Sequence, residues 1–154
     1  MKITGAYPIP CPSERAYSLL QDPVILAACM PGCEMLERTG DGEYRMKMRM
    51  TLASVCGLFD GKVRIADSQP SERFRLVVEG TGKIGFMKGD GLLSLAPDGA
   101  GVSVQYDGEV QVGGTIAAVG QRLIDTTAHM LIKRFFEKLT KHAAAIPAST
   151  VAAQ

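Results

Sequence analysis

Strict alternation of apolar and charged residues between Glu43 and Ala53 constrains the fold of this chain more than any other feature of its sequence. One set of alternate positions holds Tyr44, Met46, Met48, Met50 and Leu52, and the set between them holds Arg45, Lys47, Arg49 and Thr51. A period of two places the two sets on opposite faces of a β-strand, whereas a helix would scatter the charges around its circumference. We therefore predict an antiparallel strand that is buried on one face only.

The same period recurs along most of the chain and predicts a whole antiparallel sheet. A first strand over residues 2 to 9 ends in a run of prolines, which discourage further pairing. Later strands are expected at 33–38, 58–67, 72–84, 89–95 and 102–112, with turns at 39–42, 68–71, 87–88 and 96–99. Glycines at 80, 82, 85, 89 and 91 interrupt the middle strands and indicate bends or bulges, so the sheet should be strongly curved.

Helices are predicted in two places. Between the first two strands, Ser13 is expected to cap one short helix, and Asp22-Pro23 is expected to begin another. From Thr115 to about Ala145, apolar residues recur at steps of three and four, which indicates one long amphipathic helix. Its apolar stripe consists of Ile116, Val119, Leu123, Met130, Leu131, Phe135 and Leu139. Residues 146 to 154 are expected to form a disordered tail.

This order of elements defines the expected fold. One strand, two short helices, six further strands and one long helix are the layout of the α+β helix-grip fold, in which a curved seven-stranded antiparallel sheet wraps around the C-terminal helix. The chain of 154 residues is long enough for one domain with a substantial core, which we place at residues 1–145. Because one helix cannot fill the interior of such a sheet, we expect a ligand cavity between the two.

The predicted cavity lining combines the inner sheet face with the long helix. Methionine is unbranched and polarizable and adapts to apolar guests, although ordinary core packing is the slightly favoured interpretation of the methionine row. Hydroxyls of Tyr44, Tyr106 and Thr127 are available for polar contacts, and the Pro31-Gly32 turn is expected at the cavity mouth. The full predicted lining is Tyr44, Met46, Met48, Met50, Phe74, Leu76, Val104, Tyr106, Leu123, Thr127 and Met130.

Charge and motif patterns exclude several classes of function. The 17 Lys and Arg residues nearly balance the 16 Asp and Glu residues, so no overall field draws the chain toward nucleic acid. No nucleotide-binding glycine motif, zinc spacing or calcium loop occurs, so we expect no metal and no cofactor held by a motif. We assign no catalytic residue, since neither His129 nor Asp90 has a partner at a spacing typical of catalysis.

The sequence favours a cytoplasmic protein. It does not open with a signal-peptide pattern, and no apolar run reaches the roughly 20 residues that a membrane-spanning helix needs. The four cysteines contain no C-x-x-C pair and are expected to be reduced. Peripheral association with the inner face of the cytoplasmic membrane and a dimer formed through sheet edges both stay open.

Several segments, in order and spacing, carry a resemblance to a known family. They are Met30–Glu34, Gly57–Val63, Val112–Thr115, Ala118–Arg122 and Phe135-Phe136. Over residues 1 to 142 the chain resembles the CoxG family of carbon monoxide dehydrogenase subunits, within the START and Bet v 1-like (SRPBCC) superfamily. The resemblance implies an accessory protein of a molybdenum hydroxylase system, not the molybdenum-bearing catalyst.

The resemblance leaves three hypotheses about function. In the first, the cavity binds a quinone or another lipid-like hydrophobe while an outer surface docks the dehydrogenase. The family roles that the resemblance implies are membrane recruitment of the dehydrogenase, handling of an electron carrier and help with enzyme assembly. In the second, the protein is an assembly chaperone for the dehydrogenase without a ligand of its own. The third is a cyclase or hydrolase of the kind that occurs elsewhere in the superfamily. Family members often continue into a Pro- and Ala-rich linker with an apolar anchor, whereas this sequence stops at Gln154.

Overall fold

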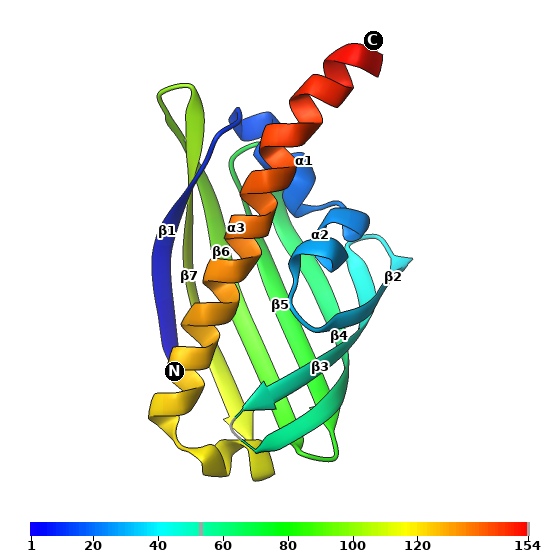
Figure 1. Ribbon diagram of the computed structural model, residues 1–154, viewed down its shortest axis with the longest axis vertical. Coiled ribbons are helices and arrows are strands. Elements are labelled where there is room, and N and C mark those ends of the chain that lie inside the picture. Colours follow the sequence, from blue (N-terminus) through cyan, green and yellow to red (C-terminus); the bar gives the residue numbers. More distant parts are fainter. Residues whose placement is uncertain (53, 154) are drawn as a thin grey trace.

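One antiparallel sheet curves around one long helix in the computed structural model, which describes residues 1–52 and 54–153, with side chains for 1–52 and 54–144 (Figure 1). The strand order is β1-β7-β6-β5-β4-β3-β2. The strands are β1 (Lys2–Ile9), β2 (Cys33–Gly40), β3 (Glu43–Leu52), β4 (Val55–Gln69), β5 (Arg73–Gly82), β6 (Gly85–Asp98) and β7 (Gly101–Gly113). The helices are α1 (Ser13–Leu20), α2 (Pro23–Cys29), the short 3-10 helix η1 (Thr115–Val119) and α3 (Gln121–Ala153). This arrangement confirms the predicted helix-grip fold.

The two short helices begin differently from each other. Asp22 caps α2 as predicted, because its side chain accepts a hydrogen bond of 2.9 Å from the Val24 backbone N–H and Pro23 takes the first helical position. The prediction that Ser13 caps α1 is wrong. Pro12 occupies the cap position in an extended conformation without a side-chain hydrogen bond, and Ser13 is the first residue of the helix.

β4 and β6 are longer than predicted, β5 is shorter, and one predicted turn is wrong. Residues 87–88 lie inside β6, where Met87 pairs with Gly80 of β5. The chain turns instead at residues 83–84, because Gly85 has a φ of +134° and packs its backbone so closely against Gly113 that a Cβ would clash there. The predicted turn at 96–99 shifts in the same way, since β6 continues to Asp98 and Gly99 takes a φ of +63°.

The C-terminal helical region is divided, contrary to the prediction of one helix from Thr115. The 3-10 helix η1 ends at Val119, and the φ of +101° at Gly120 breaks the helical path before α3 begins. Ala53, predicted as the last residue of the methionine strand, lies outside the described residues. The helix α3 continues to Ala153, past its predicted end at about Ala145. The side chains of residues 146–154 lie outside the described part of the chain, so the disorder of this tail stays a prediction.

The core consists of three clusters between the sheet and the helices. The α1 cluster includes Ile9, Phe74, Leu95, Val102, Val104 and Leu139 and lies under α1 and the later part of α3. The methionine cluster consists of Tyr44, Met46, Met48 and Val63 on β3 and β4. The η1 cluster consists of Leu52, Phe59, Ile116 and Ile124. Since burial of apolar side chains is the main favourable term in folding, the α1 and η1 clusters, which contain Leu139 and Ile124 of α3, fix that helix across the sheet.

Candidate ligand-binding site

The methionine row lies on the inner face of the sheet, as its alternation predicts. Tyr44, Met46 and Met48 are buried, and Met50 is partly exposed. Each residue of β3 from Glu43 to Leu52 pairs with a residue of β4, which fixes the direction of every side chain. Met46 lies opposite Gly61, where a Cβ would clash with the Glu79 carbonyl oxygen of β5.

Six partly buried side chains surround the methionine cluster: Met30, Leu36, Met50, Ile65, Leu76 and Val78. The structure therefore brings together Tyr44, Met46, Met48, Met50 and Leu76 of the predicted lining. Leu76 and Val78 belong to β5, which lies well inside the sheet, yet both are partly exposed. The rest of the chain therefore covers this part of the inner face only incompletely.

Three other predicted lining residues belong to the α1 cluster. Phe74 and Val104 are fully buried there, and the Phe74 ring packs edge-on against Tyr17 with centroids 5.7 Å apart. Tyr106 stacks on Phe136 at 5.9 Å, and burial raises the pKa of its hydroxyl, so this phenol stays neutral. These contacts place Phe74 and Val104 in packed core.

On α3, the predicted stripe is only partly correct. Leu123 packs against the η1 cluster and Thr127 is partly exposed, but Met130 is 40% exposed and joins none of the three clusters. The buried residues of the helix, within its described side chains, are Ile124, Phe136, Leu139 and Ala143. Since Gly120 separates η1 from α3, the apolar period of residues 115–119 does not continue in phase into α3, which is why the predicted stripe included Met130.

The Pro31-Gly32 turn ties the short helices to the methionine strand. Gly32 has a φ of +81°, and its carbonyl oxygen accepts a hydrogen bond of 2.8 Å from the Arg49 backbone N–H. A side chain at this position would clash with the Arg49 carbonyl oxygen. The turn therefore has a structural role, and its predicted place at a cavity mouth stays a prediction.

Two hollows adjoin this half of the sheet. The first, of about 430 Å³, is lined by Gln21, Arg38, Asp41, Gly42, Tyr44, Ile65 and Ser68. It reaches Tyr44 and Ile65, which belong to or pack against the methionine cluster. The second, of about 480 Å³, is lined mainly by outward-pointing charged residues, among them Arg45, Lys62 and Glu79. Both hollows open to solvent and neither is lined by Pro31 or Gly32, so an enclosed cavity under α3 stays a prediction.

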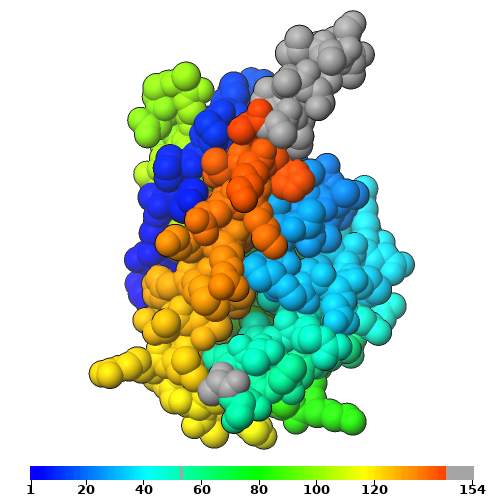
Figure 2. Space-filling model, in the orientation of Figure 1, coloured from blue at the N-terminus to red at the C-terminus, as the bar shows by residue number. Residues whose placement is uncertain are grey.

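Figure 2 shows α3 next to α2 and to the β2–β3 side of the sheet.

The predicted lining omitted several inner-face residues. Val78 of β5 and Met87 of β6 face the interior, as do Gly61, Gly80 and Gly89. The signal was present: Gly80 continues the alternation of Phe74, Leu76 and Val78, and Gly89 lies two residues after Met87. We interpreted these glycines only as bends and did not assign them to a face.

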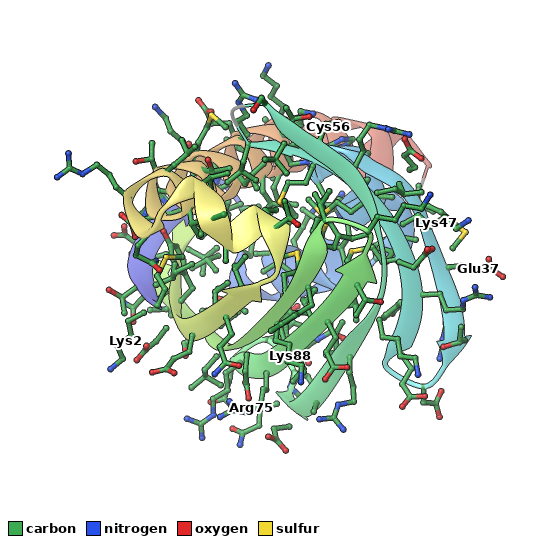
Figure 3. The ribbon with its side chains drawn as sticks, turned by 90° about the horizontal axis from the view of Figure 1, so that it is seen from below. Lys2, Glu37, Lys47, Cys56, Arg75 and Lys88 are labelled. Carbon is green, nitrogen blue, oxygen red and sulfur yellow. The ribbon has the colours of Figure 1, made fainter. Side chains whose placement is uncertain are left out.

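The two residues considered for an enzyme lie apart from the interior. Asp90 projects from the outer face of β6 and pairs with Arg75, with oxygen and nitrogen 2.6 Å apart. His129 is exposed on α3, and its Nδ1 lies 2.8 Å from the Asp125 carbonyl oxygen. Figure 3, viewed from below, shows the labelled Lys2, Arg75 and Lys88 pointing away from the interior. The structure therefore does not bring His129 and Asp90 into one site.

Metal-binding and thiol chemistry find little support in the described part of the chain. No group of three or more His, Cys, Asp or Glu side chains among these residues is placed to hold a metal ion. All four cysteines are free, and burial raises the pKa of the Cys11, Cys29 and Cys33 thiols. A raised pKa keeps these thiols protonated and weakly nucleophilic. No helix of the described residues is long and apolar enough to cross a membrane.

Comparison with solved structures first defines the class of protein. A START superfamily protein from Mycobacterium smegmatis has a TM-score of 0.71 at 14% identity, covering 94% of this chain and 98% of that one. The Zhui aromatase/cyclase from Streptomyces sp. R1128 has a TM-score of 0.65 at 12% identity, covering 94% of this chain and 93% of the enzyme. The chain therefore has the START and Bet v 1-like fold.

The family follows from a closer match. Residues 5–144 match the CoxG family of carbon monoxide dehydrogenase subunits, and the chain belongs to that family. A conserved protein from Geobacillus kaustophilus is 32% identical, with a TM-score of 0.89 and coverage of 94% of this chain and 95% of that chain. No curated protein matches the sequence significantly.

Proposed function

We propose that the protein is a non-catalytic accessory protein that holds a hydrophobic ligand, such as a quinone or a lipid, between the sheet and α3. In this proposal it serves a molybdenum hydroxylase of the carbon monoxide dehydrogenase type, docks that enzyme through an outer surface and works in the cytoplasm at the inner face of the cytoplasmic membrane. The family description supports the dehydrogenase association, and the START-like fold supports ligand binding.

One structural observation carries the ligand proposal. The methionine cluster is apolar and adaptable, and the residues beside it on the inner face, Met50, Leu76 and Val78, are only partly buried. Apolar side chains that stay accessible on the concave face of a sheet are suited to contact an apolar guest. The separation of His129 from Asp90 supports a role without catalysis of its own.

Native mass spectrometry with lipid extraction tests this proposal, using protein purified from a quinone-producing host. We expect the wild type to retain a quinone or a lipid. Met48→Arg should reduce its occupancy at least about tenfold, because an unpaired buried charge is strongly unfavourable beside an apolar guest. Thr51→Arg is the matched control, since it places the same charge on the exposed outer face of the same strand and should leave occupancy unchanged.

Two further results make this experiment decisive. Met48 is 6% exposed, so Met50→Arg serves as a second variant in case Met48→Arg does not fold. Partly exposed Met50 should accept the longer side chain and still lose the ligand. An empty wild type, or equal retention by wild type and both inner-face variants, would contradict ligand binding at the methionine cluster.

A different observation favours the assembly-chaperone alternative. Val24 on α2 is 73% exposed and Met130 on α3 is 40% exposed, so two large apolar side chains are available to a protein partner. This alternative predicts an empty interior and tighter binding to the immature dehydrogenase than to the mature enzyme. Equal affinity for both forms would count against it.

A further inference from the structure

A line of glycines crosses the inner face of the sheet next to the methionine cluster. Gly89 of β6 lies directly between Val78 of β5 and Val110 of β7. The next inner-face position of β6 is Gly91, paired with Leu76 on one side and Gly108 on the other. Since neighbouring strands lie about 4.8 Å apart, Val78 and Val110 stand about 10 Å from each other across a floor without side chains.

Other inner-face glycines lie closer to neighbouring atoms than Gly89 does. A methyl group added at Gly57 would lie 2.8 Å from Ile84 Cδ1, and one at Gly80 would lie 3.4 Å from Met87 Cγ. At Gly89 the same methyl would meet only the Glu109 carbonyl oxygen and Val110 Cγ2, both at 3.9 Å and both on β7. Within the described part of the chain, no atom of α3 comes within 4 Å of that methyl position. Gly89 is itself partly exposed, so the helix does not cover it completely.

The backbone does not require glycine at this position. Gly89 is absent from the residues with positive φ, and 3.9 Å is an ordinary van der Waals distance, so alanine would fit without strain. Glycine inside a strand weakens folding relative to alanine, because it gains no side-chain contact and loses more conformational freedom. Val78 and Val110 beside it are partly exposed although they face inward. The missing side chain thus costs stability and maintains an open space.

We propose that Gly89 is the floor of a subsite for a flat, apolar ring system, with Val78 and Val110 as its side walls. Peptide planes without a protruding methyl allow a ring to lie face-down on the strand at van der Waals distance, and one methyl would hold the ring away. The subsite rests on the proposed ligand-binding function and specifies the shape of the ligand that the function leaves open. An extended alkyl chain is the competing occupant and is an outcome of the test.

Isothermal titration calorimetry with two probes of equal heavy-atom count, 2-naphthol and 1-decanol, tests whether Gly89 is the floor of a ring-binding subsite. We expect the wild type to bind 2-naphthol more tightly than 1-decanol. Gly89→Ala should weaken 2-naphthol binding about tenfold, as one misplaced methyl group does in an apolar pocket, and should change 1-decanol binding less than about twofold. Gly89→Leu should abolish 2-naphthol binding. Gly40→Ala on β2, where a methyl would meet nothing closer than 3.4 Å among the described residues, is the matched control and should bind both probes as the wild type does.

The possible results separate this inference from the function on which it rests. A Gly89→Ala melting temperature at or above that of the wild type would show that any loss of binding is not unfolding. Unchanged 2-naphthol affinity in Gly89→Ala, equal weakening for both probes, or a wild-type preference for 1-decanol would overturn the ring subsite and leave ligand binding intact. If the wild type binds neither 2-naphthol nor 1-decanol, both the ring subsite and the proposed ligand-binding function would be overturned.

Discussion

Single glycines fix the backbone around the candidate site. Gly32 combines a φ of +81° with close packing against the Arg49 carbonyl oxygen, so any side chain there would be strained in conformation and would also clash. Its own carbonyl oxygen anchors the α2–β2 turn to β3. The position just before β2 is therefore restricted to glycine for two independent physical reasons.

Gly32→Ala should lower the free energy of unfolding by about 3 kcal/mol, since the left-handed conformation alone costs about 1–2 kcal/mol and the clash adds to it. Gly99→Ala is the control, because Gly99 has a φ of +63° with no described atom within 4 Å of an added Cβ. It should lose only about 1–2 kcal/mol. Urea denaturation measures both values, and equal losses would refute the steric part of the explanation.

The environment of a residue can be predicted from sequence when neighbouring residues determine it, and not when a distant part of the chain does. The inner face of β3 was predictable, because a period of two acts between adjacent residues. Whether an inner-face residue packs tightly, as Phe74 does, or stays accessible, as Leu76 does, depends on which helix lies above it. That information is absent from the strand's own sequence, so the predicted lining mixed core residues with accessible ones.

At the scale of elements, the succession of strands and helices was predictable and the breaks between them were less so. The chain has 17 glycines, and sequence alone does not identify which of them adopt positive φ. Gly85 and Gly120 do, and they moved the β5–β6 turn and divided the C-terminal helical region. The cap of α2 was recognisable, because Asp followed by Pro is a strong local signal.

Asp22→Ala should reduce the free energy of unfolding by about 1 kcal/mol, within the usual 0.5–2 kcal/mol for a helix N-cap. The lost hydrogen bond is the one that Asp22 accepts from Val24. Asp41→Ala is the control, because it removes a fully exposed carboxylate whose ion pair with exposed Arg38 is screened by water and contributes little. Chemical denaturation of both variants decides the matter: a loss for Asp22→Ala no larger than that for Asp41→Ala would mean that the cap does not hold α2.

The whole molecule is a curved sheet that holds one long helix through two of its three apolar clusters, the α1 cluster and the η1 cluster (Figure 1). This architecture was predictable from the order of the elements, and membership of the CoxG family confirms the resemblance seen in short segments. The ligand was not predictable in the same way, because the fold provides an apolar inner face without a motif for one compound. Our central claim is that an apolar guest binds on this face beside the methionine cluster.

Methionine-methyl NMR tests that claim most directly, because the eight methionines are distributed between the interior and the surface. With 2-naphthol added to protein labelled at the methionine methyl groups, we predict shifts at Met87, which lies on the inner face two residues from Gly89, and at Met46, Met48 and Met50. We predict no shift at Met130, which is 40% exposed on α3. Replacing these five methionines one at a time by leucine assigns the signals. Shifts confined to Met130, or no shift at any methionine, would contradict the claim that the inner face of the sheet is the binding site.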